Sequence, residues 1–218
     1  MKIIFILVFC LIINELSLSQ TTIPTGNVSG IWTLAGSPYL IQGSIQIPND
    51  STLTIQPGVT VNFQGTYKLN VQGRLIAIGT AADTIIFTAS NTTNGWRGIR
   101  FDNTLVTNDT SKIFYCKLQY GKATGSGDDT YGGAFYFKYF SKAIISNSYI
   151  SNCMADYGGG IYCNSSSPNI SYNIISNNAA TGPGGGIFCQ TSSPNISNNT
   201  ISNNIANSDG SGIILRKG

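Results

Sequence analysis

The chain has 218 residues, of which only 10% are charged, and it carries a formal net charge of +3 and no histidine. It lacks the clustered Lys and Arg of a nucleic-acid-binding surface, and without histidine it cannot form a Cys/His metal site. Regularly placed Ile, Val and Phe argue against disorder, and the length suits one large domain.

The first residues predict a secretory signal peptide over residues 1–19. Lys2 supplies a positive charge, an apolar run covers residues 3–13, and the small residues Ser17 and Ser19 place cleavage after Ser19. A membrane anchor is the alternative, but the run is too short to span a bilayer and no later stretch is apolar enough. We therefore expect a secreted or cell-surface protein that is not transmembrane after cleavage.

Residues 20–90 predict an N-terminal cap and the first irregular coils of a repetitive β-structure. Apolar and polar residues alternate over short runs that are separated by Gly and Pro-Gly turns, as in short β-strands. The clearest runs are residues 51–63, 68–80 and 84–88. They do not follow the repeat that begins after them.

Residues 91–218 predict regular coils of about 26 residues. The motif at 158–163, GGGIYC, returns at 184–189 as GGGIFC, an offset of 184 − 158 = 26. Each unit holds three short alternating strands, and such units are stable when every strand pairs in parallel with its equivalent in the next unit. The fold class is therefore expected to be all-β: a right-handed single-stranded parallel β-helix, or solenoid. Leucine-rich repeats have similar lengths but need a Leu pattern that is absent here.

This pattern resembles that of secreted bacterial proteins with right-handed parallel β-helix repeats, in the pectate-lyase-like superfold. The segments that carry the resemblance read LTIQPGVTVNF, LNVQGRLIAIGT, WRGIRF and SPNISNNTISNN, within residues 40–215. The resemblance implies the pectin lyase fold. It does not imply one activity, because the superfold hosts lyases, hydrolases, adhesins and inert surface proteins.

Aligning the units predicts vertical columns of equivalent side chains. One inward column begins at Ile99 and a second begins at Phe101. Cys163 and Cys189 fall in the second column, where other coils have Phe or Leu, so we predict that they are buried free thiols. A disulfide or a reactive role for Cys116, Cys153, Cys163 and Cys189 stays open. A third column, Asn152, Asn177 and Asn203, predicts an asparagine ladder in which amides bond along the stack at a turn that tolerates left-handed backbone.

Catalytic candidates are few. Arg97, Arg100 and Asp102 lie on the first regular coil, where they could meet the loop that bears Asp128 and Asp129. The resemblance implies that a lyase would use an Arg or Lys as base and several carboxylates to hold calcium, whereas a solvated surface ion pair is the plain alternative. The carboxylates do not recur in one column, so we expect a protein without enzyme activity and keep an enzyme as the alternative.

A long loop interrupts the repeat, because the interval from Ile99 to Phe135 exceeds the repeat by ten residues. We place the excess at residues 121–131. Long excursions from a solenoid often carry function. Asp128 and Asp129 could hold calcium there, but two carboxylates are too few for a specific site, so we predict no cofactor.

An outward column predicts a contact surface. It contains Arg100, Tyr136, Tyr162, Phe188 and Ile214. Because it alternates with two inward columns, we expect it to face solvent, where Tyr136, Tyr162 and Phe188 could bind sugar rings or a partner. Packing of these rings on one another is the alternative.

The last unit holds only its first strand, so we expect an apolar edge that needs a cap, a partner or further chain. Three functions follow as hypotheses. The first is a non-catalytic surface protein that contacts polysaccharide or another surface protein. The others are a lyase-like enzyme on acidic glycans and a structural spacer.

Overall fold

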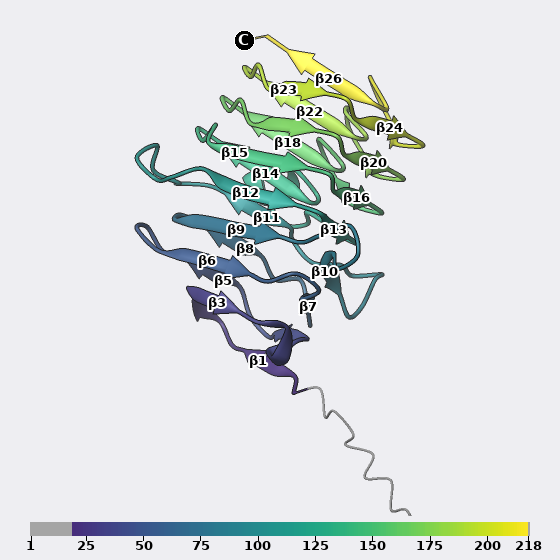
Figure 1. Cartoon of the computed structure of the whole chain (residues 1–218). Coiled ribbons are helices and arrows are strands. Elements are labelled where there is room, and N and C mark those ends of the chain that lie inside the picture. Colours follow the sequence, from purple (N-terminus) through teal and green to yellow (C-terminus); the bar gives the residue numbers. More distant parts are fainter. Residues whose placement is uncertain (1–18, 218) are drawn as a thin grey trace, which may run out of the picture.

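The protein, described by a computed structural model over residues 19–217, is a stack of coils along one axis (Figure 1). The predicted signal peptide lies outside these residues except for its last position. The helical elements of the described part are two 3-10 turns, η1 (Leu34–Gly36) and η2 (Gly127–Thr130). None of the helices found there has the length and apolar character needed to cross a membrane.

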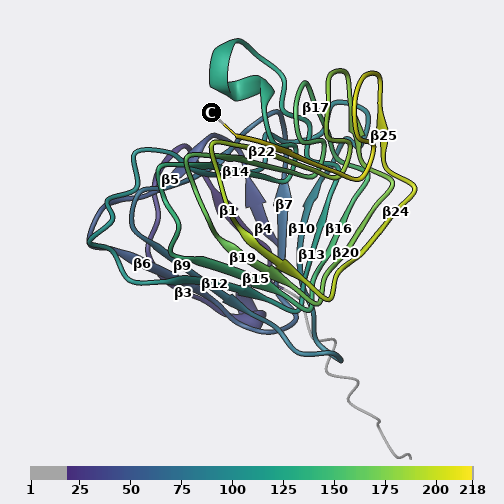
Figure 2. The same ribbon diagram turned by 90° about the horizontal axis from the view of Figure 1, so that it is seen from above.

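Three long parallel sheets form the walls, seen end-on in Figure 2. Sheet A contains β1 (Thr21–Ile23), β4 (Tyr39–Ile41), β7 (Thr60–Phe63), β10 (Ile85–Ala89), β13 (Cys116–Gln119), β16 (Tyr149–Ser151), β20 (Ile174–Ser176) and β24 (Thr200–Ser202). Sheet B contains β2 (Gly26–Asn27), β5 (Ile45–Ile47), β8 (Leu69–Val71), β11 (Ile99–Phe101), β14 (Phe135–Lys138), β18 (Ile161–Asn164), β22 (Ile187–Gln190) and β26 (Ile213–Arg216). Sheet C contains β3 (Gly30–Trp32), β6 (Thr52–Ile55), β9 (Arg74–Ile78), β12 (Ser111–Phe114), β15 (Ala143–Ser146), β19 (Asn169–Ser171) and β23 (Asn195–Ser197).

A fourth, short sheet lies between sheets A and B in the later coils. It pairs β17 (Met154–Ala155), β21 (Ala179–Ala180) and β25 (Ile205–Ala206). A full coil therefore passes from sheet A through this short strand to sheet B and then to sheet C. Every pairing between named strands is parallel, which confirms the parallel β-helix predicted from the repeat.

The predicted inward columns are confirmed in register. Ile99 pairs with Phe135, which pairs with Ile161, and the series continues to Ile187 and Ile213. Residues 20–90 were expected to form a cap and irregular coils. From β1 onward their strands extend the same three sheets, in coils of variable length.

Apolar side chains fill the interior because alternate residues of each short strand point inward. Large aromatic residues stack in this interior: the ring centres of Phe63 and Trp96 lie 4.3 Å apart, and those of Phe101 and Phe137 lie 4.8 Å apart. Ile213 and Leu215, in the last described coil, are 38% and 63% exposed, whereas their equivalents Ile187 and Cys189 are fully buried. A covering element at this edge remains a prediction.

The predicted asparagine ladder is misplaced by one residue. Asn152, Asn177 and Asn203 do adopt left-handed backbone, with φ of 55°, 56° and 53°, but their side chains are exposed. The amide that bonds along the stack belongs to the next position. The Nδ2 of Asn178 donates to the carbonyl of Ile150 and to the Oδ1 of Asn204, each at 3.0 Å.

A second ladder has the same geometry at the corner between sheets C and A. The Nδ2 of Asn173 donates to Asn199 Oδ1 at 3.0 Å and to the carbonyl of Ile145 at 2.9 Å. Both Asn173 and Asn178 are 1% exposed. The ladders arise because the side chain after the left-handed residue turns inward, where an amide can donate to a buried turn carbonyl and accept from a neighbouring coil at once; Ser148 bonds similarly through its hydroxyl at the equivalent position one coil earlier.

All four cysteines of the described chain are buried and free. Cys163 and Cys189 occupy the inward column, as predicted. Burial raises the pKa of the Cys153 thiol to about 12 and that of Cys116 further. Because the thiolate is the reactive form, these groups act as small apolar core residues at neutral pH.

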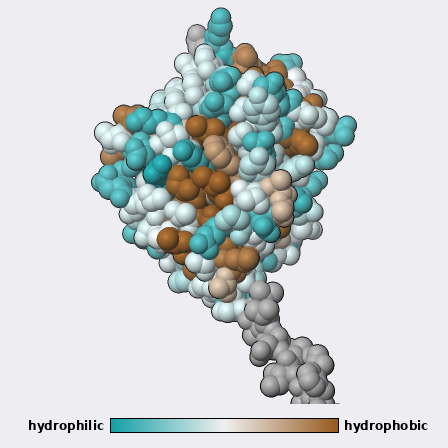
Figure 3. All heavy atoms as spheres, viewed as in Figure 1, coloured by the Kyte–Doolittle hydropathy of each residue, from teal (hydrophilic) through white to brown (hydrophobic). Residues whose placement is uncertain are grey.

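The outer face of sheet C is partly apolar. Apolar side chains gather near the middle of this face in Figure 3. Its outward positions include Ile76, Ile78, Phe114 and Ile144. Ile78 is 37% exposed, and the others are half-buried by their neighbours in adjacent coils.

Candidate functional site

The outward column of sheet B exists, but its expected exposure is wrong. Strand pairing aligns Arg100, Tyr136, Tyr162, Phe188 and Ile214 in successive coils. The first four are only 0–3% exposed. We call Tyr136, Tyr162 and Phe188 the aromatic stack, since neighbouring rings lie 5.6 Å and 5.4 Å apart and nearly parallel.

The aromatic stack is buried because loops fold over it. In Figure 2 the turn η2 and the loops with β17 and β25 project on the sheet B side of the helix. Tyr131 stacks on Tyr162 at 4.9 Å, and Tyr157 meets Phe188 edge-on at 5.4 Å. The two covering tyrosines also touch each other at 5.2 Å. They form a second, outer aromatic layer.

The excess of ten residues is divided between two connections, so its predicted placement is only partly right. Ile99 to Ser111 is four residues longer than Phe135 to Ala143, and Lys117 to Phe135 is six residues longer than Tyr149 to Ile161. The second connection contains residues 121–131, which we call the long loop. Its buried anchor is Arg100, whose guanidinium donates to the carbonyls of Asp128, Tyr131 (2.5 Å) and Gly132 (3.2 Å). The guanidinium also lies 4.2 Å from the ring centre of Tyr136. Burial lowers the pKa of Arg100 to about 10, which still leaves it charged at neutral pH.

Ion pairs occupy the carboxylates of the long loop. Asp128 pairs with Lys138 at 2.6 Å, and Asp129 pairs with Lys68 at 2.8 Å and Arg97 at 3.5 Å. The hydrogen bond from Lys138 lowers the pKa of Asp128. No group of three or more potential His, Cys, Asp or Glu metal ligands exists in residues 19–217. The aspartates considered for calcium therefore hold the loop to the coils.

The three catalytic candidates do not form a reactive cluster. Arg97 and Arg100 do meet the long loop, as expected, but each is engaged by it. Arg100 is 2% exposed, so a substrate cannot reach its guanidinium. Asp102 follows β11 and is partly exposed, and it makes no ion pair with a described residue.

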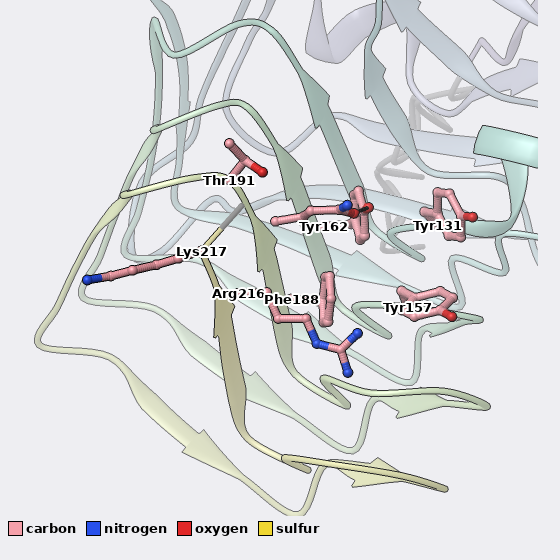
Figure 4. Close-up of a pocket in the computed structure, with 8 residues that line it drawn as sticks. Tyr131, Tyr157, Tyr162, Phe188, Thr191, Arg216 and Lys217 are labelled. Carbon is pink, nitrogen blue, oxygen red and sulfur yellow. Dashed lines mark hydrogen bonds between the residues drawn. The ribbon is translucent and has the colours of Figure 1, made fainter.

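An open hollow of about 290 Å³ lies beside the aromatic stack (Figure 4). Tyr162 and Phe188 form its floor, and their rings are almost covered. The walls are Tyr131, Tyr157, Gln190, Thr191, Arg216 and Lys217. Of the three predicted ligand-contact residues, Tyr162 and Phe188 line the hollow. Tyr136 does not, because its ring lies under the guanidinium of Arg100.

The hollow combines ring faces, a neutral amide and positive charge. The guanidinium of Arg216 lies 5.3 Å from the ring centre of Phe188. Burial raises the pKa of Tyr162 to about 12, so its hydroxyl stays protonated and donates to Gln190 Oε1 at 2.6 Å. Asp209, 3.7 Å from Arg216, has a side chain that is 78% exposed and screens the charge weakly.

The sequence reasoning identified none of the six wall residues. Tyr131 and Tyr157 are bridged in parallel and are separated by the repeat interval, 157 − 131 = 26. That interval could have identified them as an outward column. Arg216 ends β26 in register with Gln190, so the same interval places it, whereas Lys217 follows the strand and had no such signal.

These features define the molecule as a single-stranded parallel β-helix with a loop-covered outer sheet. The family described as a right handed beta helix region matches residues 40–218, and the chain belongs to this family. It is also similar to Protein bark beetle of Drosophila melanogaster, with 42% identity over 59 residues. That match covers 27% of this chain and 2% of the fly protein, so the chain spans a very small part of that relative. No solved structure matches significantly.

Proposed function

We propose that the protein is a secreted or cell-surface β-helix that binds acidic carbohydrate without cleaving it. The observation that carries this proposal is the hollow in which Arg216 and Lys217 stand beside the rings of Tyr157 and Phe188. Aromatic rings offer an apolar face to sugar rings, and cationic side chains pair with carboxylates or sulfates. The signal-like first residues and the net charge of +3 agree with an exported protein that meets anionic glycans.

The proposal predicts binding of oligogalacturonides that depends on the walls of the hollow. In isothermal titration with hexagalacturonate, the double variant Tyr157→Ala/Arg216→Ala should lose at least tenfold in affinity. Arg216 is exposed and Tyr157 is half-buried in the outer layer, so the variant leaves Tyr136, Tyr162 and Phe188 themselves in place. Arg74→Ala is the matched control, because Arg74 is a partly exposed cation on sheet C, and this variant should bind as the wild type does.

Two further measurements test the role of charge in this binding: its dependence on salt and its absence with a neutral ligand. Screening weakens exposed charge pairs, so affinity should fall as ionic strength rises from 0.05 to about 0.5 M. Maltohexaose should not bind at this hollow. If the double variant binds hexagalacturonate as tightly as the wild type, the hollow is not the site.

A polysaccharide lyase is the rival function. It needs an accessible base, and the guanidinium of Arg100 lies under the long loop with its donors engaged. Incubation with polygalacturonate and calcium, followed by ultraviolet absorbance, should show no unsaturated products. Their appearance would overturn the non-catalytic proposal.

A further inference from the structure

A second hollow, of about 220 Å³, lies at the corner where the chain passes from sheet C to sheet A. Three tyrosines line it. Tyr149 and Tyr172 are 46% and 60% exposed, and Tyr115 is half-buried. The other lining residues are Ala81, Thr84, Asn147, Ser148 and Ile174. No lining residue carries a charge.

Two of these tyrosines occupy positions where the backbone disfavours them. The residue after each of four successive sheet C strands has positive φ: 49° at Tyr115, 50° at Asn147, 59° at Tyr172 and 55° at Asn198. Asn adopts this left-handed conformation readily, whereas a bulky side chain does so only under constraint. In this column the local turn thus favours Asn, and two of its four positions carry Tyr.

The stack imposes the constraint through backbone hydrogen bonds. The amide of Tyr115 donates to the carbonyl of Ser146 one coil further on, and that of Tyr172 donates to Ser197, both at 3.2 Å. The ring of Tyr172 adds little to the core, since it is mostly exposed. Tyr139 has a similar φ of 56° at another turn, so the strain alone does not define a site; its coincidence with a hollow lined by two further tyrosines motivates a functional hypothesis.

We infer that this corner is a binding site for neutral carbohydrate, separate from the hollow over sheet B. The rings of Tyr149 and Tyr172 can stack on sugar rings, and the exposed amide of Asn147 can bond to sugar hydroxyls. Two coil steps separate Tyr115 from Tyr172, roughly 10 Å at the usual strand spacing, so an extended oligosaccharide can lie along the axis. The uncharged lining favours a neutral ligand over an acidic one.

The test replaces Tyr172 by Asn, the residue at the equivalent positions 147 and 198. Binding of chitotetraose, cellotetraose and mannotetraose is measured by isothermal titration. At least one should bind the wild type, and Tyr172→Asn should weaken that binding tenfold or more. Because Asn suits the turn, the same variant should melt about 2–4 °C higher than the wild type. A purely structural tyrosine would instead melt lower when replaced.

Controls separate this site from the first one and from other occupants. Tyr172→Phe keeps the aromatic ring, so it should still bind the neutral sugar. The double variant Tyr157→Ala/Arg216→Ala should bind the neutral sugar as tightly as the wild type does. Hexagalacturonate binding should be the same in Tyr172→Asn as in the wild type. The inference is overturned if none of the three neutral sugars binds, or if binding survives Tyr172→Asn. It is also overturned if sedimentation shows a dimer of this chain that Tyr172→Asn dissolves.

Discussion

At the scale of single residues, the turns divide two tasks between adjacent asparagines. Asn177 adopts the left-handed backbone and points outward, whereas Asn178 turns inward and bonds to neighbouring coils. The Oδ1 of Asn178 also accepts from the amide of Cys153 at 3.0 Å. The first task needs only a permissive backbone, but the second needs a buried donor and acceptor at once.

This division predicts unequal effects of substituting neighbours. Asn178→Ala should lower the free energy of unfolding by roughly 2–4 kcal/mol, because it leaves the carbonyl of Ile150 and the amide of Cys153 buried without partners. Asn177→Gly should change it by less than about 0.5 kcal/mol, since Gly accepts the same backbone conformation. Urea unfolding of both variants checks this. Equal losses would contradict the division.

The sequence identified the asparagine-rich turns but not which of two adjacent residues forms the ladder. The pattern Ser-Asn-Asn repeats both positions at the same interval, so periodicity alone cannot distinguish them. The inward orientation of Ile161 and Cys163 was predictable, because the alternation of apolar and polar residues and the parallel pairing of strands are enough to place them. The turns follow local backbone conformation, which the repeat does not encode.

At the scale of elements, the long loop converts an outward face into an enclosed one. Arg100 satisfies three loop carbonyls, and the ion pairs of Asp128 and Asp129 hold the loop to adjacent strands. The excess length was predictable from the interrupted interval. Its path over the aromatic stack was not, because an insertion has no equivalent strand to follow.

Removal of the buried guanidinium should loosen the long loop. Arg100→Met keeps most of the side-chain volume but leaves the carbonyls of Asp128, Tyr131 and Gly132 without their donor. Amide-exchange protection at residues 122–132 should fall at least tenfold, whereas that of β20 should not change. Full protection of the loop in Arg100→Met would exclude the anchoring role. Arg97→Met is the matched control, since Arg97 makes an ion pair with Asp129 but donates to none of the carbonyls that Arg100 satisfies.

Acid should loosen the same loop. The hydrogen bond from Lys138 lowers the pKa of Asp128 below its ordinary value, so the stabilisation is present above about pH 4 and is lost as pH falls through the folded pKa. The pKa of Lys138 is raised by the same bond, so its side of the pair fails only at alkaline pH. Protection factors of the loop amides should decline below pH 4 in the wild type. Asp128→Asn should show low, pH-independent protection there.

At the scale of the whole molecule, stability comes from stacking, and each coil relies on its neighbours for burial. The same substitution should therefore cost different amounts along one column. Ile161 is fully buried between coils, whereas Ile213 is 38% exposed. Ile161→Ala should lower the free energy of unfolding by roughly 2–5 kcal/mol, and Ile213→Ala by less than half as much. Equal costs in urea unfolding would contradict stacking in register.

The proposed function depends on an acidic glycan binding in the hollow over sheet B. The most direct measurement is an NMR titration of the isotope-labelled protein with hexagalacturonate, following side-chain signals of Arg216, Tyr157 and Tyr172. The account predicts saturable shifts at Arg216 and Tyr157 and none at Tyr172. Shifts confined to Tyr172 or to the outer face of sheet C, or no shifts at all, would contradict it.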